Sequence, residues 1–425
     1  MIITTEKGKI EGIEKENCFL YKGIPYAKAP TGERRLKVPE ELDAWDGIYE
    51  ADHFPNISVQ RGQKSGDFYY KEFFDDPEFI TEMNEDCLYL NIWTPKEKGK
   101  YPVAVYIHGG GFFNGYSFEK EMDGEAYCKR GVILVTINYR LGLLGFFAEK
   151  SLGYGSGNFG LLDQICAINW VNDNISAFGG DKDNITIFGQ SAGGRSVEIL
   201  STLPCMKGKF QRAIMQSSGG YIDNDLGNMT RQEKEKYIAS YMKLHFLNMD
   251  RMMKMDPAKF VKMNYRLNAY ITMRTRKGHV AGSPCIDKEI FPYDTNYAVD
   301  KGLLNDVDIM IGGTKNDIFV SKQGSRSLET NEMMKGVLTY ADKVSAHRKC
   351  YVYYFEHDLP GDDSGAFHSG ELWYMFGTLD RCYRPFGKED HELSERMLDA
   401  WTGFMKNGDP GYPEYKEGKY VERYR

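Results

Sequence analysis

The sequence has 425 residues, of which 41% are hydrophobic and 27% are charged, and its formal net charge at pH 7 is −7. This length and apolar content are sufficient for a large buried core. An acidic balance without a basic patch argues against nucleic acid or an anionic membrane surface as a partner, and we expect neither. Eight cysteines are scattered without a C-x-x-C pair, so we expect no metal site, and no motif indicates a cofactor.

The N-terminus has the composition of a strand rather than of a signal peptide. A charged residue occurs within residues 1–6, whereas a signal peptide needs an apolar stretch of about 7–15 residues. The longest apolar run, residues 132–137, has the length of a strand and is too short to span a bilayer. We therefore expect a cytoplasmic protein with reduced thiols.

A glycine run follows the first strongly apolar segment. Residues 102–107 predict a buried strand, which ends in His108 and three consecutive glycines. Glycines leave backbone N–H groups uncovered, so that they can approach a ligand closely. Beside a nucleophilic serine, such a loop supplies an oxyanion hole, in which each donor contributes about 3 kcal/mol. We predict Gly110, Gly111 and Ala192 as the donors; taken alone, the loop would also fit a flexible surface turn.

A sharp strand-to-helix turn is predicted around Ser191. Residues 185–188 are strand formers and lead directly into Gly189-x-Ser191-x-Gly193. This pattern lifts a serine hydroxyl above the end of a sheet. The helix that begins at Ala192 directs its N-terminal dipole at the same place and favours negative charge there. Ser191 is therefore the predicted nucleophile, although a serine needs a base before it can react.

The composition changes between residues 221 and 276, which are charged and rich in methionine. We predict helices there that cover the sheet near the pocket. They would form either an adaptable substrate wall or an ordinary packed layer. Residues 411–425 are expected to form a peripheral tail.

The base must be one of the histidines that follow Ser191, because in proteins with a serine turn of this kind the chain order is serine, acid, histidine. These are His245, His279, His347, His357, His368 and His391. His368 is preferred because it lies in a small-residue loop, residues 365–371, that follows a predicted strand. Catalytic residues concentrate on such loops.

The acid is expected at the end of a strand that precedes His368. Residues 306–311 predict that strand, and Asp317 lies on the loop after it. Asp306 and Asp308 lie at the opposite end, where a solvated charge is the simpler interpretation. Asp317 would fix the tautomer of His368 and stabilise the imidazolium that forms during attack. With an ordinary histidine pKa, activity would rise near pH 6 to 7.

These residues resemble the type-B carboxylesterases, a family that includes cholinesterases, fungal lipases and bacterial nitrobenzyl esterases. The resemblance covers most of the chain, and its motifs are residues 8–12, 23–26, 85–91, 138–140, 157–164, 174–181, 213–217 and 408–410. It implies an α/β-hydrolase fold, with a mostly parallel central sheet flanked by helices. It also implies a triad of Ser191, Asp317 and His368, with Gly110, Gly111 and Ala192 in the oxyanion hole.

The chain departs from the family pattern at several positions. Gln190 replaces the usual glutamate before the nucleophile, and Asp317 is one methylene shorter than the usual acid. Cys87 has no upstream cysteine within residues 51–86 to form a family disulfide. The interval from Asp317 to His368 is shorter than in relatives, which implies a reduced helical cap and a more open pocket.

The resemblance makes residues 1–425 a single domain, with 221–276 as the helical cap or insert. The predicted function is hydrolysis of a small-molecule carboxylic ester through an acyl-enzyme. A non-enzymatic interaction module of the same fold and an amide or carbamate hydrolase are the alternatives. The choline-binding tryptophan of cholinesterases has no counterpart near residues 74–79, so choline esters are not favoured. The sequence specifies neither the physiological ester nor the oligomeric state.

Overall fold

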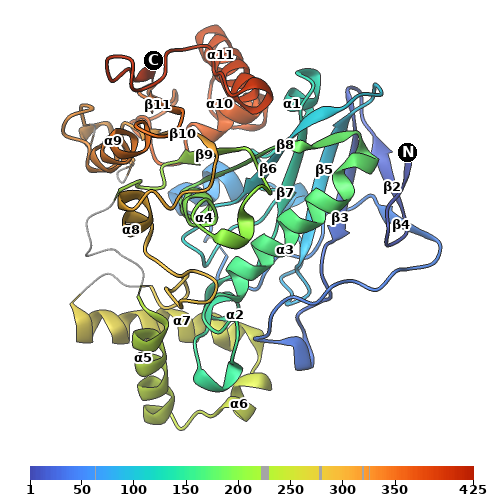
Figure 1. The fold of residues 1–425 in the computed structure, drawn as a ribbon, viewed down its shortest axis with the longest axis vertical. Helices are drawn as coiled ribbons and strands as arrows, with labels where there is room; N and C mark the ends of the chain where they lie inside the picture. The colour runs from blue at the N-terminus through green and yellow to red at the C-terminus, as the bar shows by residue number, and fades with distance from the viewer. Residues whose placement is uncertain (63, 222–228, 277–279, 318–319, 325) are drawn as a thin grey trace.

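One sheet organises the computed structural model, which describes residues 1–425 except 63, 222–228, 277–279, 318–319 and 325 (Figure 1). Its strands are β1 (Ile2–Thr4), β2 (Lys9–Glu14), β3 (Cys18–Pro25), β4 (Ile48–Ala51), β5 (Tyr89–Pro95), β6 (Tyr101–Ile107), β7 (Ile133–Ile137), β8 (Gly180–Gln190), β9 (Arg212–Gln216), β10 (Asp308–Thr314), β11 (Cys350–Phe355) and β12 (Glu422–Tyr424). They lie in the order β1-β2-β3-β5-β7-β6-β8-β9-β10-β11-β12, and β4 pairs with β2.

The strands from β7 to β12 are parallel, whereas β1, β2, β3 and β5 join through antiparallel pairs. The parallel strands are apolar along most of their length because helices cover both faces. Their register brings the strand ends level: Ile107 pairs with Gly189, and Gln216 pairs with both Gln190 and Gly312. The loops that follow β6, β8 and β10 therefore emerge along one edge of the sheet. The predicted α/β-hydrolase fold with a mostly parallel sheet is confirmed.

Helices cover the two faces of the sheet. The described helices are α1 (Glu125–Lys129), α2 (Gly142–Phe146), α3 (Phe159–Asn174), α4 (Ala192–Leu200), α5 (Arg231–Leu244), α6 (Met249–Met253), α7 (Pro257–Thr275), α8 (Thr295–Asp300), α9 (Glu332–Val344), α10 (Leu372–Phe376) and α11 (Lys388–Asn407). Helices α3, α4 and α9 pack with one face in a single core cluster, and α1, α10 and α11 pack with the other. No described helix combines the length and the apolar composition needed to cross a membrane.

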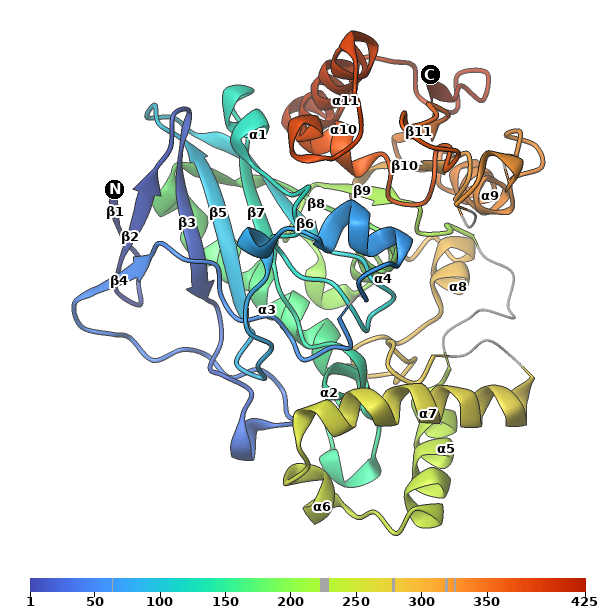
Figure 2. The same ribbon diagram turned by 180° about the vertical axis from the view of Figure 1, so that it is seen from behind.

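The methionine-rich segment forms a separate helical layer, which projects from the sheet beside α2 (Figure 2). Helices α5, α6 and α7 share a hydrophobic cluster with residues 143–148, and Met242, Met252 and Met263 are buried in it. Thr230 begins α5 with a reciprocal capping box to Glu233, an arrangement that satisfies orphan N–H groups at a helix start. Within the predicted 221–276 insert, residues 222–228 lie outside the described part of the chain.

The prediction that residues 411–425 form a peripheral tail is wrong for the last residues. β12 pairs in parallel with β11, from Tyr353↔Glu422 to Phe355↔Tyr424. Tyr424 is only 2% exposed, and Arg423 and Arg425 pair with Glu356. The sheet therefore extends to the C-terminus, although a three-residue strand with two charged residues carries no apolar pattern that would predict it.

A buried ion pair holds the short helical turn Tyr70–Phe74 in place. Glu72 and Arg384 are both buried, and Nε of Arg384 donates to Oε1 of Glu72 at 2.8 Å. Arg384 also donates to the carbonyl of Pro360 at 2.8 Å and to Asp362 at 3.0 Å. These contacts fix Glu72, and with it the neighbouring Phe73.

The Arg384→Ala substitution should remove about 3–5 kcal/mol from the free energy of unfolding, because it leaves Glu72 buried without a counter-charge. Urea denaturation followed by circular dichroism measures this. The matched control is Arg423→Ala, at an ion pair whose arginine side chain is 39% exposed, and it should cost less than about 1 kcal/mol. Equal losses of unfolding free energy in both variants would contradict the view that the buried Glu72–Arg384 ion pair holds this turn in place.

Candidate active site

A cavity of about 270 Å³ opens at the edge where the parallel strands end. Gly109, Gly110 and Gly111 line it from the loop after β6, Gln190 and Ser191 from the turn after β8, and His368 and Ser369 from the loop after β11. Tyr69, Phe73, Phe74, Phe113 and Leu372 supply apolar surface. Several chain segments thus place polar and apolar groups around one space, as small-molecule sites do.

The turn at Ser191 is strained and tightly packed. Ser191 has φ 56° and ψ −123°, a conformation that costs a non-glycine residue energy and is typical of functional sites. A Cβ atom on Gly193 would lie 1.9 Å from the carbonyl oxygen of Ile107, so only glycine fits there. The N–H of Ser191 donates to the carbonyl of Gln216 at 2.8 Å. Close contact with β6 and β9 therefore holds the serine at the cavity.

The glycine loop packs directly against this turn. A Cβ on Gly109 would approach the Gln190 carbonyl oxygen to 2.8 Å, and Gly110 and Gly111 have φ of 95° and 65°. Within the described residues, the N–H groups of Gly110 and Gly111 have no hydrogen-bond acceptor. Ala192 is the first residue of α4, where an N–H has no partner inside the helix. The N–H groups of the three predicted donors therefore have no acceptor within their own loop or helix.

His108 supports the loop and does not act as a base. Its ring stacks on Tyr139 with centroids 4.5 Å apart, and its Nδ1 lies 2.9 Å from the Gly109 carbonyl oxygen. Burial lowers the pKa of His108 to about 4. A neutral, buried imidazole of this kind can fill space and orient the loop, but it does not gain a proton near neutral pH.

Asp317 and His368 are in direct contact, through Oδ1 of the acid and Nδ1 of the imidazole. Asp317 is 4% exposed, and its Oδ2 accepts from the Ser217 hydroxyl at 2.8 Å and from the Thr314 N–H at 3.1 Å. Burial by itself would lower the pKa of His368, but the charge and hydrogen bond of Asp317 outweigh it, so that the pKa lies above its usual value. The pair can therefore hold a proton or accept one.

Asn316 ties the loop of the acid to the loop of the histidine. Its N–H donates to the Ala366 carbonyl at 2.9 Å, and its Oδ1 accepts from the Ala366 N–H at 3.0 Å. Its Nδ2 also donates to the Ser321 carbonyl at 2.7 Å. Ala366 lies two residues before His368, so this contact sets the distance between the two loops.

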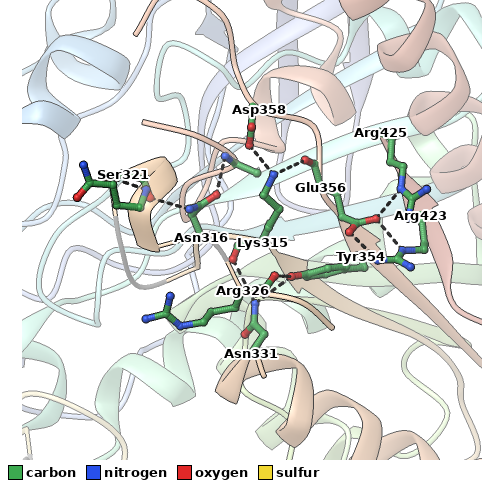
Figure 3. Close-up of polar contacts among 12 residues, drawn as sticks. Lys315, Asn316, Ser321, Arg326, Asn331, Tyr354, Glu356, Asp358, Arg423 and Arg425 are labelled. Carbon is green, nitrogen blue, oxygen red and sulfur yellow. Dashed lines mark hydrogen bonds and ion pairs between the residues drawn. The ribbon is translucent and has the colours of Figure 1, made fainter. Parts of the chain in front are cut away.

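Neighbouring polar contacts hold the same loop from the other side (Figure 3). Lys315 pairs with Asp358 at 2.8 Å. Asn331, which caps α9, donates to the carbonyl of Thr314 at 3.0 Å. The two residues before Asp317 and the end of β10 are therefore anchored to α9 and to the segment after β11, and this anchoring limits movement of the acid.

Ser191 and His368 line the same cavity, but the described residues include no hydrogen bond between the Ser191 hydroxyl and the imidazole. Instead, Nε2 of Gln190 lies 3.2 Å from Nε2 of His368. Catalytic contacts of this kind are often long before substrate binds. The structure thus joins Asp317 to His368, and brings Ser191 to the same space without that contact.

The other histidines considered above lie elsewhere. His357 pairs with Asp390 at 2.8 Å, and His391 is half exposed near Asp380. His347 is exposed, and the ring of His245 is tilted against that of Tyr241, with centroids 4.3 Å apart. His279 lies outside the described residues.

Sequence patterns did not single out Asn316, Ser217 or Glu371 as parts of this site. Glu371 is fully buried one turn after His368, and burial, with the nearby charge of Asp317, raises its pKa to about 7. Ser217 has a positive φ of 47°, a sign of local strain next to Asp317. Of the aromatic residues near the glycine loop, Phe113 lines the cavity, whereas Phe112 packs on Phe146.

The chain matches known proteins over nearly its whole length. The model of the carboxylesterase family matches residues 1–327 and 319–422. The para-nitrobenzyl esterase of Bacillus subtilis (strain 168) is 32% identical, over 98% of this chain and 93% of that protein. Mouse neuroligin-3 is 29% identical, over 94% of this chain and 60% of that protein. A solved structure of a thermophilic PNB esterase superposes with a TM-score of 0.86 at 29% identity, over 100% of this chain and 96% of that one.

Replacement of Asn316 tests its role as a positioning residue. In Asn316→Ala we expect kcat for a nitrophenyl ester to fall by about tenfold to a hundredfold, because the acid and histidine loops lose their shared register. KM should change much less. The control is Asn184→Ala, which removes hydrogen bonds to the Lys406 carbonyl and from Arg212; Asn184 does not line the cavity, so kcat should be unchanged. An unchanged kcat in a folded Asn316→Ala protein would show that the contact does not position the loops.

Proposed function

The chain belongs to the carboxylesterase family and is a carboxylic ester hydrolase, and we propose that it acts through an acyl-enzyme on Ser191. The single observation that carries this proposal is the contact between buried Asp317 and His368, whose partly exposed side chain faces the same cavity as a serine on a strained turn. A nucleophile, a base and an orienting acid in one space are the components of serine hydrolysis.

In the proposed mechanism, the Ser191 hydroxyl attacks the ester carbonyl while Nε2 of His368 takes its proton. The N–H groups of Gly110, Gly111 and Ala192 stabilise the oxyanion, because they point at charge that exists only in the transition state. His368 then gives its proton to the departing alcohol. Water then attacks the acyl-enzyme with His368 as its base, and the carboxylic acid product leaves Ser191. Asp317 keeps the proton of Nδ1 in place throughout.

Two alternatives use the same chain differently. An interaction module would not need a buried acid in contact with an imidazole that opens on a cavity, so this observation favours the enzyme. Amide or carbamate hydrolysis would use the same groups, but an alcohol leaves more readily than an amine.

We further propose that residues 1–425 act as one domain. In that domain, α5–α7 would border the cavity through Tyr265, whose ring lies 6.0 Å from that of Phe113.

The Ser191→Ala substitution should abolish the burst of nitrophenol that reports acylation, and should lower kcat by at least about a thousandfold. Stopped-flow absorbance with 4-nitrophenyl acetate measures both, and labelling by a fluorophosphonate followed by mass spectrometry locates the adduct. Ser201→Ala is the control, since that hydroxyl donates to the Val197 carbonyl at 2.7 Å inside the protein. A burst that persists without Ser191 would place the nucleophile elsewhere.

The pH profile follows from the raised pKa of His368. The base must be neutral, so kcat/KM should rise with pH through this pKa, with a midpoint above the usual value of about 6.5. In Asp317→Asn the negative charge is lost, so the midpoint should move to lower pH while the plateau falls by about 10⁴. Initial rates between pH 5 and 9 measure both changes. A midpoint that does not move would mean that Asp317 does not control the imidazole.

A further inference from the structure

Two glutamates that the proposed mechanism does not use form part of the cavity wall. Glu119 and Glu121 follow the glycine loop, and their exposed fractions are 9% and 1%. Both line the cavity that holds Ser191 and His368. Glu119 accepts a hydrogen bond from the Tyr116 N–H at 3.0 Å. Carboxyl groups are almost never buried without a partner, so their presence here needs a reason.

Several polar atoms on this wall are not satisfied by the rest of the protein. Among the described residues, the Oδ1 of Asn114 and the hydroxyl of Tyr106 are buried without a hydrogen-bond partner, and the buried carboxyl group of Glu121 has the carboxyl group of Glu119 as its side-chain partner. All three residues line the same cavity as Glu119. A buried polar atom without a partner costs about 1–3 kcal/mol, and two carboxyl groups in contact cannot both be ionised without a cation. Two carboxyl groups in contact and two polar atoms without partners around one cavity indicate that a ligand supplies a positive charge and a donor.

No cation of the protein compensates these carboxyl groups from inside the cavity, since the described residues that line it include neither lysine nor arginine. Lys120, between the two glutamates, pairs with Asp75 at 2.8 Å. Arg381, whose positive charge acts to lower the pKa of Glu121, forms an ion pair with Asp123. Burial raises the pKa of Glu119 to about 7 and that of Glu121 well above its usual range, where the charge of Glu119 adds to the effect. A cation from a ligand would lower these pKa values again and so favour the charged carboxylates.

We propose that Glu119 and Glu121 bind a protonated amine in the alcohol portion of the ester. The inference rests on the proposed function and names the class of substrate. The alcohol side follows from the contacts of this wall. Tyr69 donates to the His368 carbonyl at 3.2 Å. His368 returns the proton to the leaving alcohol, so the wall beside it receives that group.

The same wall continues from His368 to the glutamates. Tyr69 immediately precedes the helical turn that ends at Phe74, and the ring of Phe74 lies 5.9 Å from that of Tyr116. The N–H of Tyr116 in turn donates to Glu119. Aromatic faces attract cations, and carboxylates accept from N–H donors more strongly when the donor is charged. A protonated amine satisfies both, whereas a quaternary ammonium has charge but no N–H to donate.

Three benzoate esters with the same acyl group test the proposal. They are 2-(dimethylamino)ethyl benzoate, its uncharged isostere 3-methylbutyl benzoate, and the trimethylammonium analogue, choline benzoate. We expect kcat/KM for the dimethylamino ester to exceed that for the isostere by at least about tenfold, with choline benzoate in between. Release of benzoate, followed by chromatography, measures each rate. In Glu121→Gln and Glu119→Gln, the ratio of the dimethylamino ester to its isostere should fall by at least about fivefold.

The control variant is Glu125→Gln, a glutamate of the same segment that contacts Asn17 outside the cavity, and it should leave the ratio unchanged. Equal rates for the charged ester and its isostere, or a ratio that survives both glutamate substitutions, would overturn the inference while ester hydrolysis itself stands. Binding of the same esters to Ser191→Ala, measured by calorimetry, separates the two proposals. A preference for the amine there supports the site even if hydrolysis fails, and equal affinities refute it.

Discussion

The site depends on the close contact between the ends of β6 and β8. Gly193 leaves no space for a Cβ beside the Ile107 carbonyl, and Gly109 leaves little beside the Gln190 carbonyl. Since both contacts involve backbone on each side, the serine turn and the glycine loop form one rigid unit. The positions of Ser191, Gly110 and Gly111 relative to one another therefore follow from the pairing of two strands. Rigid elements of this kind hold reacting groups more accurately than loops alone.

The acid and the histidine need a second arrangement, because they come from loops separated by a long stretch of chain. Here the Asn316 N–H donates to the Ala366 carbonyl, the Asn316 side-chain Oδ1 accepts from the Ala366 N–H, and Asn316 forms an isolated parallel bridge with Phe367. This local contact, and not the register of β10 and β11, joins the two loops. The buried carboxylate of Asp317 has donors from Ser217 and Thr314. These donors offset the cost of burying its charge. The imidazole is thus oriented by a group that is itself fixed.

Sequence patterns predicted the fold, the serine turn and the glycine loop because these signals are local: strand residues, glycines and a helix start lie within a few positions of each other. They identified Asp317 and His368 by chain order, strand ends and family resemblance, and the structure brings these two together. They could not predict the role of Asn316, which depends on a partner 50 residues away. They missed β12 because its pairing, and not its composition, makes it a strand. They missed Glu119 and Glu121 because a glutamate in a charged stretch is ordinarily exposed.

The replacement of the usual glutamate by Gln190 becomes understandable from the charges around the imidazole. His368 already has Asp317 in contact and Glu371 nearby, and both raise its pKa. The amide of Gln190 lies 3.2 Å from Nε2 of the ring. A carboxylate in that place would raise the pKa further and leave less neutral base near pH 7. Since Glu119 and Glu121 also face the cavity, a neutral residue at 190 limits the negative charge there. The base stays available, and the two carboxyl groups of the cavity wall lie where we propose that the alcohol portion of a cationic ester binds.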